Sequence, residues 1–268
     1  MSISLIVPTY RNPKYLDLCL KSATENALLN DTQIIVIVDG FIEESKEVLS
    51  KYPEVSILEL EENKGMQYAL NYGVAQASNE FVFIINDDNV MPRNWDVGLL
   101  YCLDKCEKNC VLTVDQVEPV GPGMFNFDVH DLGQTADTFQ YDEWLNYEYQ
   151  IQSSEEKKDG HIFPFVIQKK YYMAVGGFDT FYNSPNICDW DFFLKLELLD
   201  FVFPRTKMMH LYHFGSIATK KNAESTIFKQ KEQQAFSDYE WKWGAKPTNQ
   251  SGSNSKLPLD RQFRGFKV

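Results

Sequence analysis

The sequence predicts an α/β fold: a Rossmann-like, mostly parallel sheet flanked by helices, followed by a smaller region of mixed structure. Two observations support this prediction. Short β-branched or aromatic runs alternate with segments of helical hydrophobic spacing through the first hundred residues. Polar residues follow directly after several of these runs, where a parallel sheet places its ligand sites. Repeated strand–helix–strand units give right-handed crossovers and a parallel sheet.

The first half supplies the predicted strands and helices of this sheet. Strands are expected at residues 3–9, 34–39, 55–60 and 81–86. Two of them are nearly continuous apolar runs, as is typical of strands covered on both faces. Helices are expected at residues 13–26, 42–51 and 64–77, where apolar residues recur at helical spacing.

The second half is less regular. Residues 128–160 are acidic and rich in Tyr and Trp, and their weak periodicity fits either an antiparallel excursion or a long loop. Further on, we expect strands at 161–168 and within 201–209, and helices at 169–175 and 189–199. The stretch from 244 is turn-rich and polar, which indicates a mobile tail. The sequence therefore divides into residues 1–100, residues 101–243 and a tail at 244–268.

The composition limits the function. The 268 residues are 44% hydrophobic, enough for a sizeable core, and their net charge of −12 argues against a nucleic-acid partner. Five cysteines without regular pairing fit a reducing compartment, and Cys102, Cys106 and Cys110 are expected on one face of a structural helix. Neither a signal-like start nor a run of about 20 apolar residues is present, so we expect a cytoplasmic protein without a transmembrane segment.

Three predicted strands deliver polar residues to one edge of the sheet. The first two end at Pro8-Thr9-Tyr10 and at Asp39-Gly40, and the third ends at an acidic doublet. In open parallel sheets a ligand binds beyond the carboxyl ends of the strands. The sequence therefore predicts a site at this edge.

The acidic doublet stands out because an apolar strand leads directly into it. FIINDDNVMP, residues 83–92, ends its apolar run at Asn86, Asp87 and Asp88. Adjacent carboxylates repel each other and need a compensating cation, and hard oxygen ligands suit Mg²⁺ or Mn²⁺. A divalent cation there would in turn bind a diphosphate. Asn-Asp-Asp-Asn is also a favourable turn sequence, so a plain turn stays open as the alternative.

A second cluster lies in MMHLYHFGS. Of its two histidines, His213 is the better candidate for a further metal ligand, although a lone histidine is more often structural. Lys220 and Lys221 follow closely, and such a pair could neutralise a departing diphosphate.

A third cluster stands at the start of the helix expected at 189–199. Asp189 and Asp191 either cap this helix or provide a base. Asp189, beside Trp190, could take a proton from a hydroxyl nucleophile.

Taken in order, these motifs resemble the family 2 glycosyltransferases of the GT-A fold. The resemblance rests on SLIVPTYRN, IVIVDG, ENKGMQYALNYGVAQASNEFVFIINDDNVMP, GGFD followed by CDWD, and HFGS, and it covers residues 2–216. The ordered set is far more specific than the acidic doublet alone.

The resemblance implies a nucleotide-sugar-binding first half. Pro8, Thr9 and Tyr10 would line the nucleoside pocket, and Asp39 would bond the base. The helix that faces the nucleotide would open with Asn63, Lys64 and Gly65. Lys220 would assist at the diphosphate.

The resemblance also implies the metal ligands. Asp88 matches the metal-holding last aspartate of the family's Asp-x-Asp motif, and His213 matches the histidine ligand of some members. Asp87 takes the variable middle position, facing the ribose or sugar. The first position is Asn86, a neutral amide, where an acid is usual.

By the same resemblance, the second half of the domain is catalytic and binds the acceptor. Asp189 matches the catalytic base, although Cys188 replaces the usual acid before it. The remaining acceptor-side residues would be Gly177, Phe178, Trp190 and Asp191.

The resemblance thus implies an inverting enzyme that depends on Mn²⁺ or Mg²⁺. It would move a sugar from a nucleotide diphosphate sugar to a hydroxyl of a glycan or other acceptor. A UDP-sugar is the favoured donor. One alternative is a sugar nucleotidyltransferase, although no Gly-rich phosphate loop follows the first strand. The other is a non-catalytic nucleotide-sugar-binding module, for which Asn86 and Cys188 in place of acids would argue.

Overall fold

A computed structural model describes residues 1–106, 109–121, 127–157, 160–215, 226–244 and 246 of the chain. In this part of the chain the strands form one ten-stranded sheet in the order β3-β2-β1-β4-β9-β6-β10-β5, with β7 paired to β6 and β8 to β10. The single sheet runs through both predicted halves, which are therefore joined by backbone hydrogen bonds.

The first half of the sheet is parallel, as the alternation of strands and helices predicts. It contains β1 (Ile3–Thr9), β2 (Gln33–Asp39), β3 (Ser56–Leu60) and β4 (Phe81–Ile84). The connecting helices are α1 (Pro13–Glu25), α2 (Ile42–Leu49) and α3 (Met66–Gln76). The observed bounds agree with the predicted ones to within a few residues.

In the second half, β9 (Phe165–Gln168) lies antiparallel between β4 and β6 (Leu112–Glu118). Because β10 (Arg205–His213) pairs parallel with β6, the strands β1, β2, β4, β6 and β10 all run in one direction. Their carboxyl ends consequently meet at one edge. The shorter strands are β5 (Asn89–Val90), β7 (Asp128–Val129) and β8 (Glu156–Lys157).

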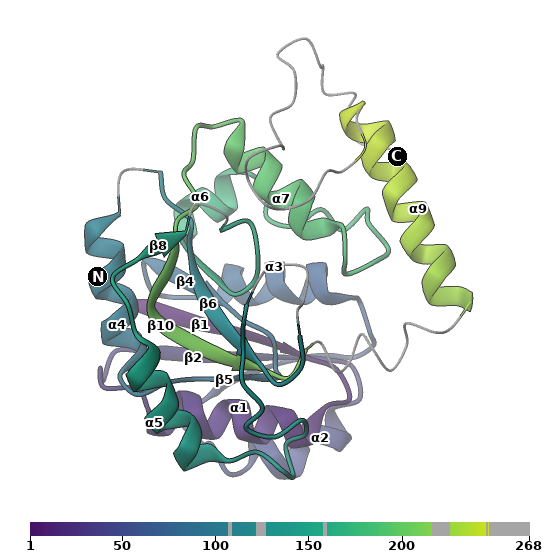
Figure 1. The fold of residues 1–268 in the computed structure, drawn as a ribbon. Helices are drawn as coiled ribbons and strands as arrows, with labels where there is room; N and C mark the ends of the chain where they lie inside the picture. Colours follow the sequence, from purple (N-terminus) through teal and green to yellow (C-terminus); the bar gives the residue numbers. More distant parts are fainter. Residues whose placement is uncertain (107–108, 122–126, 158–159, 216–225, 245, 247–268) are drawn as a thin grey trace.

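Alternate residues of each strand supply the two main cores. On one face, Leu5 and Val7 of β1 pack with α1, α2 and α4 (Trp95–Lys105). On the other face, Ile6 packs with α3 and with three later helices, α6 (Lys169–Ala174), α7 (Cys188–Glu197) and α9 (Thr226–Trp243). In Figure 1, α6 and α7 lie above the sheet and α1 and α2 below it.

Three elements differ from the prediction. Residues 128–160 contain a helix, α5 (Tyr141–Ile151), which buries Trp144 and Leu145 against β10 and β6. Helix α9 was not predicted. The prediction that Cys102, Cys106 and Cys110 share one helix face is wrong. Helix α4 ends at Lys105, and the backbone of Cys110 forms an isolated β-bridge with Val202.

The five cysteines are free thiols in this structure. Among the described residues, no helix combines the length and the apolar character that a bilayer crossing needs. The predicted tail lies outside the described residues except for positions 244 and 246, and Lys220 and Lys221 lie outside them as well.

Candidate active site

A cavity of about 500 Å³ opens at the carboxyl edge of β1, β2 and β4. One wall consists of the residues that the sequence predicts on the nucleotide side. These are Pro8, Thr9, Tyr10, Asp39, Asn63, Lys64, Gly65, Asn86, Asp87 and Asp88. Residues from four separate segments of the chain therefore meet around one space, as their positions at strand ends and helix starts predict.

The opposite wall comes from parts of the chain that the sequence did not point to. It consists of two parts, the segment after α6 and the first turns of α9. The lining residues of these two parts are Thr180, Tyr182, Asn183, Ser184, Pro185, Ile227, Phe228 and Lys231. Gln67 Nε2 donates to the carbonyls of Tyr182 (2.9 Å) and Ser184 (2.7 Å), which ties the two walls together.

Asp87 is a buried carboxylate held by the loop after β1. It accepts hydrogen bonds from Thr9 Oγ1 (2.7 Å) and from Asn12 Nδ2 (3.1 Å). Burial, and next the neighbouring Asp88 carboxylate, raise the pKa of Asp87 to about 7. The doublet is thus more than an exposed turn, because both of its carboxylates are buried.

Asp88 faces a histidine of β10, the strand that pairs with β5. Its Oδ1 lies 3.5 Å from His213 Nε2, and both side chains are less than a tenth exposed. The antiparallel pairing of β5 with β10 sets His213 opposite Asn89, and so brings the histidine to the doublet. The other ring nitrogen, Nδ1, lies 2.8 Å from Oε1 of Glu118, the last residue of β6.

Asp88 and His213 fit a divalent ion. Carboxylate oxygen and imidazole nitrogen are ligands that Mn²⁺ accepts, and two ligand bonds of about 2.1 Å can meet across a gap such as theirs. No set of three or more His, Cys, Asp or Glu in the described ranges is arranged to hold an ion. Among the described residues, Asp88 and His213 would therefore supply two ligands, and phosphate oxygens and water would fill the remaining positions, as is usual for Mg²⁺.

Asp39 anchors the turn that opens α3. Its two oxygens accept the backbone N–H groups of Lys64 (2.6 Å) and Gly65 (2.9 Å). Burial raises the pKa of Asp39, and the two hydrogen bonds oppose this rise. At Gly40, where φ is +78°, a Cβ would lie 2.8 Å from the backbone nitrogen of Asn63. The turn at 63–65 therefore packs directly against the end of β2.

The predicted catalytic base stands at the start of α7, outside the cavity lining. Asp189 is half-buried, and its Oδ1 accepts the N–H of Trp190 at 2.9 Å. The side chain of Trp190 is half-buried too and packs edge-on against Phe236 of α9.

Three residues expected to face an acceptor lie in the interior instead. Asp191 is fully buried, with Oδ1 accepting from Tyr182 Oη (3.0 Å) and Trp243 Nε1 (2.8 Å). Phe178 is buried in the aromatic core beneath α7. Gly177 has a φ of +63°, and a Cβ there would lie 2.3 Å from the Asn71 side chain. These positions hold the loop and helix in place and offer no surface to an acceptor.

The mostly parallel sheet with a cavity at its carboxyl edge is the architecture of the GT-A fold, and comparisons with known proteins agree. The sequence profile of Glycosyl transferase family 2 matches residues 4–176, more than half of the chain. The chain therefore belongs to glycosyltransferase family 2.

Relatives of known sequence are also named glycosyltransferases. An uncharacterized glycosyltransferase of Haemophilus influenzae is 26% identical over 84% of this chain and 71% of its own length. Glycosyltransferase GlyG of Streptococcus pneumoniae is 29% identical over 34% of this chain, and the match spans 32% of that protein.

Solved structures share the fold at low sequence identity. S. aureus TarS 1–349 has a TM-score of 0.56 and 15% identity, covering 96% of this chain and 76% of TarS 1–349. GalNAc-T7, crystallised with UDP, GalNAc and Mn²⁺, has a TM-score of 0.61 and 13% identity, covering 80% of this chain and 44% of its own. Both are GT-A glycosyltransferases, which confirms the predicted fold class.

Proposed function

We propose that the chain is an inverting, metal-dependent glycosyltransferase that uses a UDP-sugar and an acceptor hydroxyl. The observation that carries the proposal is the contact of His213 with Asp88, because Asp88 lines the cavity together with the predicted nucleotide-side residues. The volume of about 500 Å³ falls within the usual range for small-molecule sites. A TarS crystal structure in complex with UDP and the GalNAc-T7 complex with UDP and Mn²⁺ support the choice of nucleotide and metal by analogy.

In this proposal the walls of the cavity bind and orient the donor. Asp39 and the turn that it anchors face the nucleobase, and Asp87 faces the ribose or the sugar. Asp88 and His213 hold Mn²⁺ or Mg²⁺, which supplies positive charge to the leaving diphosphate. Lys231 adds a cation from the opposite wall.

The chemical step is a single displacement. Asp189 takes the proton of the acceptor hydroxyl. At the same time the hydroxyl oxygen of the acceptor attacks the anomeric carbon from the face opposite the diphosphate. The bond to the diphosphate breaks in the same step, so the anomeric configuration inverts. A positioned base of this kind contributes about 10²- to 10⁴-fold in rate.

The test is a donor panel with Mn²⁺. The purified chain is incubated with UDP-, GDP- and dTDP-sugars, and the released nucleoside diphosphate is measured. Turnover with a UDP-sugar is expected, and NMR of the glycoside should show an inverted anomeric centre. A retained configuration would contradict the mechanism. Release of pyrophosphate from a triphosphate would identify a nucleotidyltransferase instead.

Variants test the named residues. Asp189→Asn should abolish transfer and leave UDP binding nearly intact, whereas Asp104→Asn, on the exposed face of α4, should retain activity. Wild-type turnover in Asp189→Asn would show that the base is assigned wrongly. Tight donor binding by the wild type without turnover on any acceptor would favour the binding module.

A further inference from the structure

The end of β6 carries a carboxylate that the sequence motifs do not include. Glu118 is the last residue of β6, and β10 runs parallel beside it with Tyr212 opposite Val117. The next residues along both strands are Glu118 and His213, so the sheet register itself sets them side by side. Their side chains are 15% and 9% exposed, and Glu118 Oε1 lies 2.8 Å from His213 Nδ1.

This contact determines which ring nitrogen of His213 has a lone pair available for a metal ion. A neutral imidazole has one N–H donor and one lone pair. A carboxylate accepts only, so its contact at Nδ1 favours the tautomer with the proton on Nδ1 and the lone pair on Nε2. Nε2 is the nitrogen that lies 3.5 Å from Asp88 Oδ1. The lone pair is thus turned toward the carboxylate that the proposed function makes a metal ligand.

Glu118 acts through the histidine rather than as a ligand. No arrangement of three His, Cys, Asp or Glu side chains within the described ranges could hold one ion, so Glu118 does not complete a ligand set with Asp88 and His213. Neither Glu118 nor His213 is among the residues that line the cavity, whereas Asp88 is. Carboxylates that accept from a metal-bound histidine in this way fix its orientation and raise its basicity.

We propose that Glu118 is a positioning residue: it holds His213 in the Nδ1–H tautomer and directs Nε2 toward Asp88, so that the pair binds a divalent cation tightly. The inference rests on the proposed function for its metal. It predicts that an uncharged side chain at position 118 weakens Mn²⁺ binding although no ligand atom is removed. Loss of such a partner typically lowers metal affinity about 10- to 100-fold.

The experiment measures Mn²⁺ binding directly. Free Mn²⁺ is followed by EPR in titrations of the full chain with UDP present, for wild type, Glu118→Ala, Asp88→Ala and His213→Ala. Glu118→Ala is expected to weaken Mn²⁺ binding about 10- to 100-fold. The control is Glu148→Gln, which neutralises the carboxylate 3.9 Å from Nδ1 of the other buried histidine of β10, His210, and should leave Mn²⁺ affinity unchanged.

A second readout does not depend on metal. The ¹⁵N shifts of the His213 ring, assigned by comparison with His213→Ala, report the tautomer. The wild type should show the proton on Nδ1, and Glu118→Ala should shift the population toward Nε2–H. If Glu118→Ala does not fold, Glu118→Leu, which fills more of the space of the glutamate and also lacks an acceptor oxygen, replaces it, with the same expected direction in both measurements.

The outcomes separate the two proposals. Wild-type Mn²⁺ affinity in the Glu118 variant, with weakened binding in Asp88→Ala and His213→Ala, overturns the role of Glu118 and leaves the metal site standing. Unchanged binding in Asp88→Ala and His213→Ala contradicts the metal site of the proposed function itself. An unchanged His213 tautomer in the Glu118 variant also overturns the inference.

Discussion

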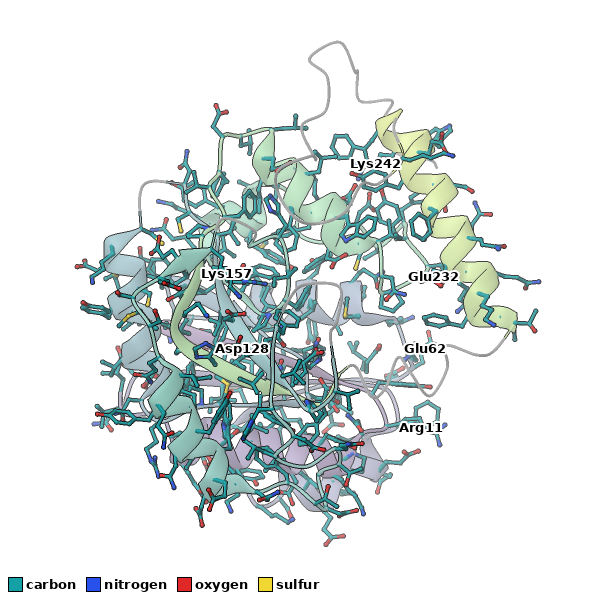
Figure 2. All side chains as sticks on the ribbon, in the orientation of Figure 1. Arg11, Glu62, Asp128, Lys157, Glu232 and Lys242 are labelled. Carbon is teal, nitrogen blue, oxygen red and sulfur yellow. The ribbon has the colours of Figure 1, made fainter. Side chains whose placement is uncertain are left out.

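Lys242 Nζ lies 2.6 Å from Asp191 Oδ1 although the lysine side chain is 1% exposed. The same ammonium group lies 2.7 Å from Asp179 Oδ2, so one buried cation joins two carboxylates. Lys242 is near the end of α9, and Asp191 is in the first turn of α7. Figure 2 shows Lys242 on the side of α9 that faces α7. The contact fastens the last described helix to the helix that carries the proposed base.

Removing this cation should destabilise the protein strongly. Lys242→Met leaves the fully buried Asp191 without its nearest cation, and breaking a buried ion pair on one side typically costs about 3–5 kcal/mol. The free energy of unfolding from urea denaturation measures the effect. Lys229→Met, an exposed lysine of the same helix, is the control and should change stability by less than about 0.5 kcal/mol. A loss below about 1 kcal/mol in Lys242→Met would show that the pair contributes little.

The other end of α9 leads to a prediction about donor binding. Lys231 lines the cavity and Lys229, also exposed and on the same helix, does not. Lys231→Glu should weaken UDP binding roughly 2- to 5-fold, because a charge contact at an exposed site is worth up to about 1 kcal/mol. Lys229→Glu makes the same charge change and should have a much smaller effect. Calorimetric titration with UDP at low and high salt measures both.

Varying the salt concentration tests whether the effect of Lys231 on UDP binding is electrostatic. The difference between the two variants should shrink as salt rises, because exposed charges are screened beyond about 10 Å at 0.1 M. Equal UDP affinities for Lys231→Glu and Lys229→Glu at low salt would remove Lys231 from the donor site.

The last residue of β1, Thr9, leads to a prediction about the acidic doublet. Thr9→Val removes the hydroxyl that donates to Asp87 at 2.7 Å and keeps the shape of the side chain. A buried carboxylate that loses a donor typically costs about 1–3 kcal/mol. Thermal and urea denaturation should show this loss. Thr24→Val, which removes a hydroxyl bonded only to α1 carbonyls, is the matched control and should be nearly neutral.

The strand ends could be predicted from the sequence because each is marked locally. An apolar run with Thr9, Asp39 or Asp87 at or near its end identifies both the strand and the edge where it ends. Parallel topology then brings these ends together at one edge of the sheet. Glu118 ends a strand in the same way. Its partner is 95 positions away, and only the pairing of β6 with β10 brings the two together.

Helices α5 and α9 were missed because their buried positions are few. Helix α9 buries Ala235, Tyr239 and Trp243, four residues apart, among polar neighbours, so few apolar residues mark its buried face.

The prediction for Asp191 was wrong for a geometric reason. At about 100° per residue it lies about 200° around α7 from Asp189, so that one motif sends its two acids in different directions.

The pH dependence of stability should reveal Asp39. Burial raises the pKa of this carboxyl above its ordinary value of 3.8, so the folded protein keeps the proton to a higher pH than the unfolded chain does. The contribution of Asp39 to stability is therefore fully present below about pH 4 and is lost as the pH rises through the folded pKa. Asp39→Asn cannot titrate, and its single acceptor oxygen leaves one of the N–H groups of Lys64 and Gly65 unbonded.

Urea denaturation of wild type and Asp39→Asn from pH 4.5 to 8 tests this. The variant should be less stable throughout, by about 1–3 kcal/mol for the lost acceptor. The advantage of the wild type should decrease as the pH rises and then level off, since all other titrating groups are shared. An advantage that grows with pH would mean that the two backbone hydrogen bonds outweigh burial, and that the pKa of Asp39 is lowered.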